Sequence, residues 1–447
     1  MGDVYVPSDR YWGAQTQRSY ENFKIGLEKM PIELIYALAT IKLAAAKANF
    51  SLRPEKMSAE KRDAIVEAAE DIFSSALDQN FPLSVWQTGS GTQTNMNVNE
   101  VMATRANEIL KKKLVHPNDD VNMSQSSNDV FPAAMHIAAV SEIHKTLLPA
   151  IDALTETLRR LESENTDAVK SGRTHLQDAT PITFAQEVSG WRASLEVARK
   201  MILSATEPLS ALALGGTAVG TGLNAPAGFD KLVCEEISRI TGLNFYPSEN
   251  KFHSLSSKDE IVFMHGALKA LAADLMKMAN DVRWLASGPR CGLGEITIPA
   301  NEPGSSIMPG KVNPTQCEAL TMVAVQVMGN DAAISIAASQ GNFELNVFMP
   351  VIIYNFLQSV RLLSDAINSF NVNCAVGIKA NKEKMKEYLN NSLMTVTALS
   401  PIIGYENAAK TVHLAFEKNV TLREACITLG FLDGKTFDEN FHPDKMV

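Results

Sequence analysis

The sequence predicts an all-α protein whose centre is a bundle of long helices. From Ser257 to Gly288 the apolar residues alternate at spacings of three and four, a heptad seam that continues for about four heptads. A second seam of the same kind runs over residues 137–161. The alternation of apolar and polar residues that is typical of strands is rare and short. Long helical periodicity with little competing strand signal indicates a helical bundle.

The chain is expected to divide into three domains. A loop-rich N-terminal domain over 1–127 surrounds helices expected near 31–50 and 59–79. A central bundle over 128–369 is followed by a small helical domain over 370–447, which has turns at Gly404 and Gly430. The five bundle helices are expected over 137–161, 182–205, 257–288, 315–338 and 345–369. Seams this long and regular favour association between copies of the chain.

Local signals mark several helix ends. Ser257-Lys-Asp-Glu260 is typical of a capping box, and Gly288-Pro289 of a helix stop. Pro149 lies inside the second seam, where we expect a kink. Three further starts are expected at prolines that follow good capping residues, namely Pro132, Pro181 and Pro314, and at the last of these Asn313 and Gln316 would complete a capping box.

Composition excludes some functions. The formal net charge of −9 over 447 residues argues against broad nucleic-acid binding, which needs a basic surface. No apolar run approaches the ~20 residues of a membrane span, and the N-terminus has no basic or apolar leader. A soluble chain that binds neither nucleic acid nor membrane is expected.

Cysteine usage predicts neither disulfides nor a metal site. The five cysteines are odd in number, and no two have the spacing of a CxxC or zinc motif. They are Cys234, Cys291, Cys317, Cys374 and Cys426. A reduced compartment follows, and the clustered thiolates that an iron–sulfur centre needs are not supplied.

Polar loops interrupt the apolar helical pattern at four places. Each is rich in Ser, Thr, Asn and Gly, whose short side chains offer neutral hydrogen-bond donors. The loops cover 88–95, 124–129, 171–178 and 304–314. Because helix N-termini present free N–H groups and partial positive charge, convergence of the helix starts near these loops would make a site for a small anion. Caps occur on every helix, so the caps alone leave an ordinary structural interpretation equally open.

The loop at 304–314 carries a family resemblance. Gly304-Ser-Ser-Ile-Met-Pro-Gly-Lys-Val-Asn-Pro314 resembles the signature of the fumarase/aspartase superfamily. Trp86-Gln-Thr-Gly-Ser-Gly-Thr-Gln93 and His116-Pro-Asn-Asp-Asp120 are similar to fumarase segments in the same order, so the resemblance covers the whole chain. It implies a three-domain all-α fold in which the long-helix bundle forms the core of a homotetramer.

Two features favour the class II fumarase branch. His175 stands where aspartases carry Gln, and Thr315-Gln-Cys-Glu318 is the fumarase-like continuation. The resemblance implies a lyase of the tricarboxylic acid cycle that reversibly hydrates fumarate to L-malate without metal or other cofactor. It implies a cytoplasmic enzyme, or one of the mitochondrial matrix if a leader has been removed. Aspartate ammonia-lyase, another lyase of the superfamily and a non-catalytic structural homologue stay as alternatives.

The resemblance also implies catalytic roles. Ser305 is the expected base that removes a carbon-bound proton, provided that nearby cations and helix dipoles ionise it. His175, paired with Glu318, is the expected acid for the leaving hydroxide. Lys311 and Asn313, with the backbone amides near Ser306 and Met308, would stabilise the aci-carboxylate intermediate. The alternative for Ser305 is that it merely turns the loop, and the other histidines are read as structural: His136, His144, His253, His265, His413 and His442.

Two dicarboxylate sites are implied. The residues expected to hold the substrate are Ser90, Gly91, Thr92, Ser126, Ser127, Asn128, Thr174, Ser306, Lys311, Val312 and Asn313. A second, peripheral site is expected at Lys113, His116, Pro117, Asn118 and Asp119. Family members commonly carry arginine at the position of Lys113, and lysine offers a point charge instead of a bidentate fork. Each active site of the homotetramer is expected to combine loops from different subunits.

Overall fold

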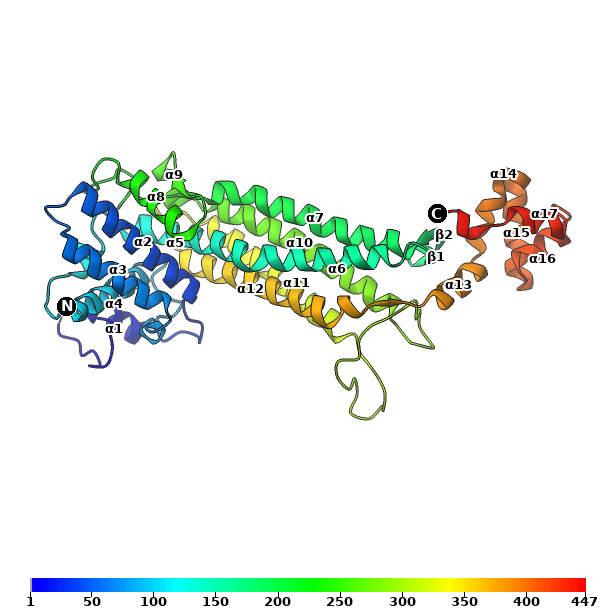
Figure 1. The fold of residues 1–447 in the computed structure, drawn as a ribbon, viewed down its shortest axis with the longest axis horizontal. Coiled ribbons are helices and arrows are strands. Elements are labelled where there is room, and N and C mark those ends of the chain that lie inside the picture. The colour runs from blue at the N-terminus through cyan, green and yellow to red at the C-terminus, as the bar shows by residue number, and fades with distance from the viewer. Residues whose placement is uncertain (1) are drawn as a thin grey trace. The chain divides into compact units, whose positions relative to one another are not determined.

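The computed structural model describes residues 2–447, and Figure 1 shows a chain that is helical nearly throughout. The all-α prediction is therefore confirmed. The helices of the first half are α1 (Ala14–Asn22), α2 (Ile32–Leu52), α3 (Ala59–Phe73), α4 (Thr92–Leu110), α5 (Ser127–Glu142), α6 (Leu148–Ser163) and α7 (Phe184–Leu209). Those of the second half are α8 (Phe229–Thr241), α9 (Lys251–Ser256), α10 (Asp259–Leu285), α11 (Thr315–Ala338), α12 (Met349–Asn373), α13 (Lys382–Asn391), α14 (Ser400–Ile403), α15 (Tyr405–Lys418), α16 (Leu422–Thr428) and α17 (Gly434–Asn440).

Short irregular turns and small sheets complete the fold. The 3₁₀ turns are η1 (Asp78–Asn80), η4 (Ala375–Gly377), η5 (Leu393–Leu399) and η6 (Pro443–Lys445), and the π turns are η2 (Pro117–Val121) and η3 (Ile143–Leu147). The strands are β1 (Val169–Thr174), β2 (Gln177–Thr183), β3 (Ala211–Leu212), β4 (Tyr246–Pro247), β5 (Ile296–Thr297) and β6 (Lys379–Ala380). They pair as antiparallel β1–β2, parallel β3–β4 and antiparallel β5–β6.

Contacts divide the chain into two compact units. Unit 1 consists of Met1–Pro149, Ala198–Ala272 and Val323–Ser364, and unit 2 of Ala150–Val197, Ala273–Met322 and Asp365–Val447. Each unit therefore gathers segments that are far apart in sequence. The three-domain division at residues 127 and 369 stays a prediction.

Both predicted seams are buried. The seam residues of α10, from Ile261 to Leu285, are at most 4% exposed. In the second seam every apolar residue is also buried, while His144 is half-buried with its Nδ1 3.0 Å from the Val140 carbonyl oxygen, as its structural interpretation predicts. The helix is interrupted just before Pro149 by the π turn η3. Because proline lacks an N–H group and its ring displaces the preceding turn, this irregularity lies where a kink was expected.

Helix α2 is the core of the N-terminal part of unit 1. It is apolar on nearly all sides, and it packs against α3, α4, α5 and α8. A helix of this composition is stable only when it is surrounded. One cationic side chain, Lys42, is buried in this core with 0% exposure.

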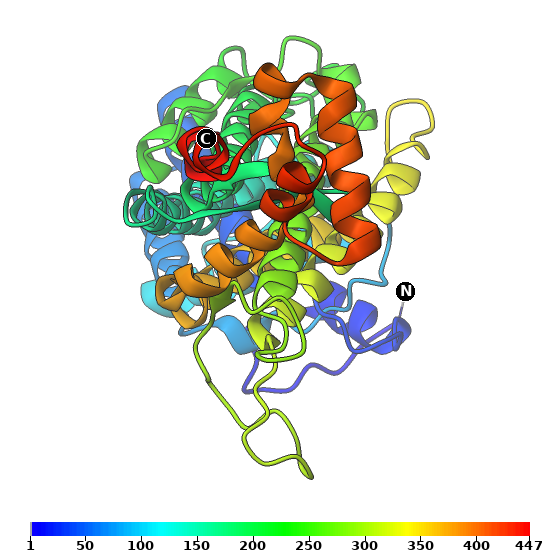
Figure 2. The same ribbon diagram turned by 90° about the vertical axis from the view of Figure 1, so that its right-hand side faces the viewer.

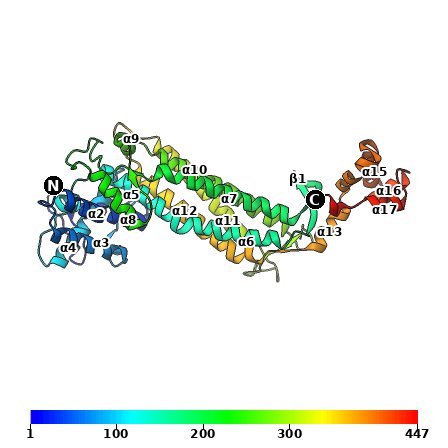
Figure 3. The same cartoon turned by 45° about the horizontal axis from the view of Figure 1, so that its top comes forward.

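Polar contacts also bind the long helices. In unit 1, His265 of α10 lies 3.0 Å from Asp331 Oδ1 of α11 and 2.9 Å from Ser359 Oγ of α12. In unit 2, Trp191 Nε1 of α7 donates to Asp281 Oδ2 of α10 at 3.0 Å. Figure 3 shows α13 next to the β1–β2 hairpin, and the C-terminal helices of unit 2 enclose an apolar core that includes Leu399 and Phe437.

Helix α11 differs from the other long helices in its exposure. Its most apolar 18-residue window is only 33% buried, and Met322, Val325 and Ile336 are 60–68% exposed. By length and composition it is the one helix in the described part of the chain that passes the criterion for a membrane span. An apolar surface of this kind needs a partner.

Candidate active site

The four polar loops fall into the two units in pairs. Loops 88–95 and 124–129 belong to unit 1, and loops 171–178 and 304–314 belong to unit 2.

In unit 1, loop 88–95 turns tightly into α4. Gly91, the N-cap of this helix, has a φ of +71°, and a Cβ there would lie 2.2 Å from the ring of Phe131. A Cβ at Gly89 would lie 1.4 Å from the Val347 carbonyl oxygen. Only glycine fits such close approaches. The turn holds the Ser90 and Thr92 hydroxyl oxygens 2.9 Å apart at the helix start.

Loop 124–129 forms the capped start of α5. Ser126 Oγ accepts from the Asn128 N–H, and Asp129 Oδ1 accepts from the Ser126 N–H at 2.8 Å, which completes a capping box. Asp129 Oδ2 accepts from the N–H groups of Gly215 and Thr217, each at 3.0 Å, so the buried carboxylate also fastens that loop. Burial raises the pKa of Asp129 to about 6, although these hydrogen bonds oppose the rise.

The two loops of unit 1 meet through side chains. Asn95 Nδ2, in the first turn of α4, donates to Ser127 Oγ at 2.9 Å. Two helix N-termini therefore lie side by side in unit 1, where their free N–H groups and partial positive charge favour an anion. Asn128 donates its amide N–H to the Ala218 carbonyl oxygen at 2.8 Å, so only part of its side chain is available to a ligand.

Residues expected at both dicarboxylate sites line one cavity of unit 1. The cavity has a volume of about 700 Å³, and it includes Ser126 and Ser127 together with Asn118 and Asp119. Arg53 and Lys56, which the sequence did not single out, add two cations to its wall. Their position in the turn after α2 carries no sequence signal that would distinguish them from solvated surface.

The rest of the expected second site is a π turn. η2 begins after His116, whose Nδ1 accepts from the Asp119 N–H at 3.3 Å. Pro117 occupies its first position, and Lys113 is exposed in the preceding loop. The neighbouring Asp120 is buried and accepts from Lys61 Nζ at 2.7 Å, so it anchors the turn.

In unit 2, loop 171–178 is a β-hairpin tip. His175 and Leu176 have φ values of +57° and +62°, and they connect Thr174 of β1 to Gln177 of β2. Turns of this kind favour Asn and Gly, so two residues with full side chains are held there at a cost. His175 and Thr174 are exposed at the tip.

A buried ion network holds the hairpin. Glu295 is 0% exposed, and Arg173 donates two hydrogen bonds to it, of 2.8 and 3.1 Å. Lys170, 1% exposed, lies 3.1 Å from Glu295 and 2.7 Å from Glu187. Bidentate contacts of this kind fix both distance and orientation, so they define where His175 is presented.

The helix start expected at Pro181 is wrong. Pro181 lies inside β2 opposite Ser171, next to an irregularity in the ladder, where a residue without an N–H group is tolerated. α7 begins three residues later, where Thr183 and Gln186 exchange backbone and side-chain hydrogen bonds. The start expected at Pro132 is also misplaced, because α5 begins at Ser127 and includes this proline.

Loop 304–314 belongs to the long connection between α10 and α11, which Figure 2 shows as an extended loop. Its neck is closed by the Gly304 N–H, which donates to the Lys311 carbonyl at 2.8 Å, and by Asn313 Nδ2, which donates to the Gly304 carbonyl at 2.7 Å. A Cβ at Gly304 would lie 2.6 Å from the Lys311 oxygen. Hydrogen bonds therefore fix the neck of the loop, while residues 306–312 are exposed.

The Ser305 hydroxyl oxygen accepts two hydrogen bonds from the backbone of its own loop. It accepts from the backbone N–H groups of Ile307 at 3.3 Å and Met308 at 3.1 Å. Two such donors favour negative charge on this oxygen. The Met308 amide, which we expected to face the intermediate, is thus directed at Ser305. Ser306 is exposed beside it.

The capping box expected at Asn313 and Gln316 does not form. Asn313 uses its amide to close the neck of the loop, and Gln316 Oε1 accepts from Ser369 Oγ at 2.7 Å. α11 still begins at the expected place, since the Pro314 carbonyl accepts from the Glu318 N–H.

A second cavity lies in unit 2 beside this loop. Its volume is about 690 Å³, and its lining includes Lys311, Val312 and Glu318. Arg283 of α10, which the sequence did not single out, contributes another cation. Within residues 2–447, His175 and Glu318 form no ion pair with each other.

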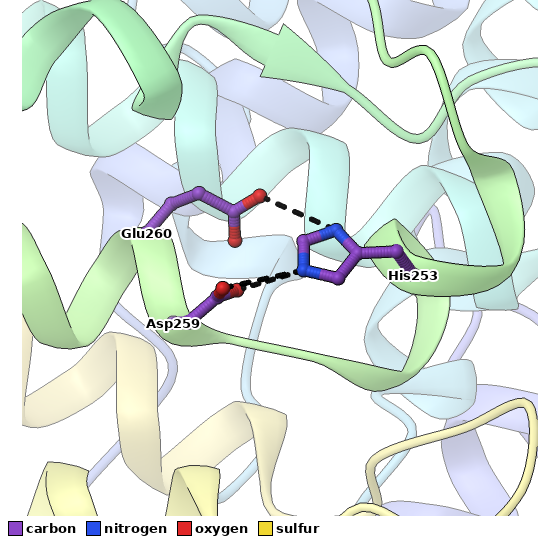
Figure 4. A group of neighbouring side chains, drawn as sticks. All are labelled: His253, Asp259 and Glu260. Atoms are coloured by element: carbon purple, nitrogen blue, oxygen red, sulfur yellow. Dashed lines mark hydrogen bonds and ion pairs between the residues drawn. The ribbon is translucent and has the colours of Figure 1, made fainter.

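One group of side chains has the donor set of a metal site. His253, Asp259 and Glu260 place their ligand atoms within 4.8 Å of one another at the start of α10 (Figure 4). The ring nitrogens of His253 lie 3.2 Å from Asp259 and 3.8 Å from Glu260, which are ion-pair distances. All three belong to unit 1 and lie outside the four predicted loops.

Comparisons with known proteins identify the family. The model of a lyase family matches residues 2–329, and that of the fumarase C C-terminus matches residues 396–447. A class II fumarate hydratase of Bacillus subtilis is 62% identical over 100% of this chain and 97% of its own length. One of Helicobacter pylori is 60% identical with the same coverage. The crystal structure of a class II fumarase from Schistosoma mansoni superposes with a TM-score of 0.97 at 45% identity, covering 99% of this chain and 97% of that one.

Proposed function

This chain belongs to the class II fumarate hydratase family, and we propose that it uses Ser305 as base and His175 as acid to interconvert fumarate and L-malate. It is a lyase that reversibly adds water to fumarate. Neither aspartate ammonia-lyase nor a non-catalytic homologue finds support among its relatives. We place the reaction in the tricarboxylic acid cycle of the cytoplasm, as the bacterial relatives favour.

Proton removal is the difficult step. When malate loses water, a C–H bond next to a carboxylate breaks and leaves a dianionic aci-carboxylate. Ser305 takes this proton. The observation that supports this proposal is that Ser305 Oγ accepts hydrogen bonds from two backbone N–H groups. Lys311 and Asn313 lie at the neck of the same loop and stabilise the charge that develops.

The hydroxyl group then leaves with a proton from His175, and addition of water to fumarate runs these steps in reverse. The support for His175 is its exposed place on a hairpin tip with left-handed backbone, held by the Arg173–Glu295 network. Glu318 is proposed to orient it and to raise its basicity.

Substrate carboxylates are held by hydroxyl and amide donors. Ser90, Gly91, Thr92, Ser126, Ser127 and Asn128 present them at the starts of α4 and α5, and Thr174, Ser306, Lys311, Val312 and Asn313 complete the set. A peripheral dicarboxylate site is proposed at Lys113, His116, Pro117, Asn118 and Asp119, with Arg53 and Lys56 as the additional cations of that cavity.

The active enzyme is proposed to be a homotetramer with composite sites. The exposed apolar surface of α11 supports this assembly, because an apolar helix in water needs a covering partner. Association between copies also accounts for the length and apolar character of α11 without a membrane.

The activity is tested by following loss of fumarate absorbance in the ultraviolet, with EDTA present and malate identified as product. Rapid hydration is the expected result. Ammonia release from aspartate without fumarate hydration would overturn the proposal in favour of aspartate ammonia-lyase. Silence with both substrates would point to another lyase or to a structural role.

A further inference from the structure

A buried lysine lies beneath the substrate loops of unit 1. Lys42 of α2 is 0% exposed, and its Nζ donates to Asn122 Oδ1 and to Gln125 Oε1, each at 2.9 Å. Burial lowers its pKa to about 7, and only the charge of Asp129 opposes this. Both acceptors are neutral amide oxygens. A buried cation held by neutral acceptors costs free energy, so a purely structural site would favour an apolar side chain here.

Lysine fixes the direction of the amides around it. An ammonium group has three donors and no acceptor, so Asn122 must present its oxygen to Lys42. The same Asn122 Oδ1 accepts from Asn95 Nδ2 at 3.3 Å and from Asn99 Nδ2 at 3.2 Å. The orientation of one amide therefore determines the orientation of the next two.

The sequence of hydrogen bonds ends at Ser127. Asn95 Nδ2 donates to Ser127 Oγ at 2.9 Å, so the serine oxygen is an acceptor on its buried side. Its hydroxyl proton is then free to be donated elsewhere. Ser127 is half-buried and lines the cavity of unit 1, so the open direction leads to that cavity.

This orientation leaves two buried amide oxygens without a partner. Asn95 Oδ1 and Asn99 Oδ1 are both buried and have no hydrogen-bond partner among residues 2–447. An unsatisfied buried acceptor costs free energy. Turning Asn95 over would face its oxygen toward both Asn122 Oδ1 and Ser127 Oγ, and Lys42 prevents Asn122 from adjusting.

We propose that Lys42 is a positioning residue, which sets the direction of the relay Lys42–Asn122–Asn95–Ser127 so that the Ser127 hydroxyl donates to a substrate carboxylate. The inference deepens the proposed function and rests on it, since Ser127 must face the dicarboxylate. Lys42 itself touches no substrate.

The decisive variant is Asn95→Asp, which keeps shape but leaves only acceptors beside Ser127. The Ser127 hydroxyl must then donate its proton to the new carboxylate. It can therefore no longer donate a hydrogen bond to the ligand. Asn99→Asp is the matched control, because it adds the same charge beside the same Asn122 oxygen without contacting Ser127. Succinate, a saturated dicarboxylate, serves as the probe in titration calorimetry, so binding is read without turnover.

We expect Asn95→Asp to weaken succinate binding about tenfold more than Asn99→Asp does, the effect of losing one hydrogen bond to a charged group. In a Ser127→Ala background this difference should disappear. Equal effects of the two variants, or a difference that persists without the serine hydroxyl, would overturn the relay and leave only a charge effect.

Lys42→Met provides a second test. The variant is expected to lower the unfolding temperature, because Gln125 Oε1 loses its donor, and to raise KM for fumarate more than it lowers kcat. Unchanged KM in a stable Lys42→Met protein would overturn the proposal. Should the variant fail to fold, the Asn95 and Asn99 pair still decides. Wild-type protein that neither hydrates fumarate nor binds succinate would overturn the proposed function as well. If the wild type is active and the Asn95→Asp variant binds succinate normally, only the relay is overturned.

Discussion

At the scale of single residues, the candidate catalytic groups are set by their backbone surroundings. His175 lies at a left-handed hairpin tip, and Ser305 lies in a loop whose neck admits only glycine at 304. Unfavourable backbone is retained in proteins mainly where function needs it. Neither feature could come from helix packing, because both residues lie outside the helices.

Removing either catalytic group should therefore affect turnover and not folding. We expect Ser305→Ala and His175→Asn each to lower kcat by about 10²–10⁴, the range for a general acid or base. Steady-state assays together with thermal melts measure both quantities. Because both side chains are partly or fully exposed, the melting temperature should stay within about a degree or two. Near-wild-type turnover in either variant would remove the role we assign to that residue.

At the scale of elements, the β1–β2 hairpin depends on buried charge. Glu295 is the common partner of Lys170 and Arg173, and all three are largely or fully withdrawn from water. Burial of such groups is tolerated only while each has its partner. The hairpin that presents His175 is thus coupled to the segment after α10.

Glu295→Gln should destabilise the protein strongly. The substitution leaves Arg173 without its carboxylate and Lys170 with Glu187 alone, and breaking a buried pair typically costs about 3–5 kcal/mol. Chemical denaturation would measure the loss. The matched control is Glu417→Gln, at an exposed position of α15, which should change stability by no more than about 0.5 kcal/mol. A small effect at Glu295 would mean that the network is not needed for stability.

Helix α5 should make stability depend on pH through His136. Its ring lies 2.9 Å from the Ala211 carbonyl, and burial, followed by the charge of Lys258, lowers its pKa to about 4. The folded state thus resists protonation that the unfolded chain accepts near pH 6.5. Stability contributed by the neutral ring is present above about pH 6.5 and is lost as pH falls toward 4, at about 1.4 kcal/mol per unit.

The measurement is urea unfolding at a series of pH values between 7 and 4 for the wild type and for His136→Gln, which keeps an amide donor but does not titrate. The variant should show a shallower decline in the free energy of unfolding over this window. Identical slopes would show that His136 does not titrate as its burial predicts.

At the scale of the whole molecule, the exposed apolar surface of α11 is the main feature that a single chain leaves unexplained. Met322 is 68% and Ile336 66% exposed in this helix. Association of copies would cover them, and composite sites would then make activity depend on assembly.

Charges on α11 should therefore abolish both assembly and activity. We expect Met322→Glu with Ile336→Glu to give a smaller species in sedimentation and to lower hydration by at least about a hundredfold. Phe416→Glu, at a 77% exposed apolar position of α15, is the matched control and should leave both unchanged. Fully active monomers, from this variant or from dilution of the wild type, would contradict the composite site.

The sequence predicted the helices better than it predicted the site. The two seams located long helices because helical periodicity is local and repeats many times, and the α10 seam is buried as expected. Helix starts were less predictable: Pro181 occurs in a strand because pairing with β1 overrides the local preference of the residue. Arg53, Arg283 and Lys42 were not identified from the sequence. For Lys42 a signal was available, because it is a lysine within the apolar run of α2.

The sequence by itself determined the helical class, the long seams, the four polar loops and, through their resemblance, the family, because each of these is written in contiguous residues. Only the tertiary structure decided which loops meet. Three hydrogen bonds join residues that are between 32 and 122 positions apart in the sequence. They link Asn95 to Ser127, Lys42 to Asn122 and Arg173 to Glu295. The physical reason is that hydrogen bonds and buried charges are satisfied by neighbours in space, which local patterns of residues do not specify.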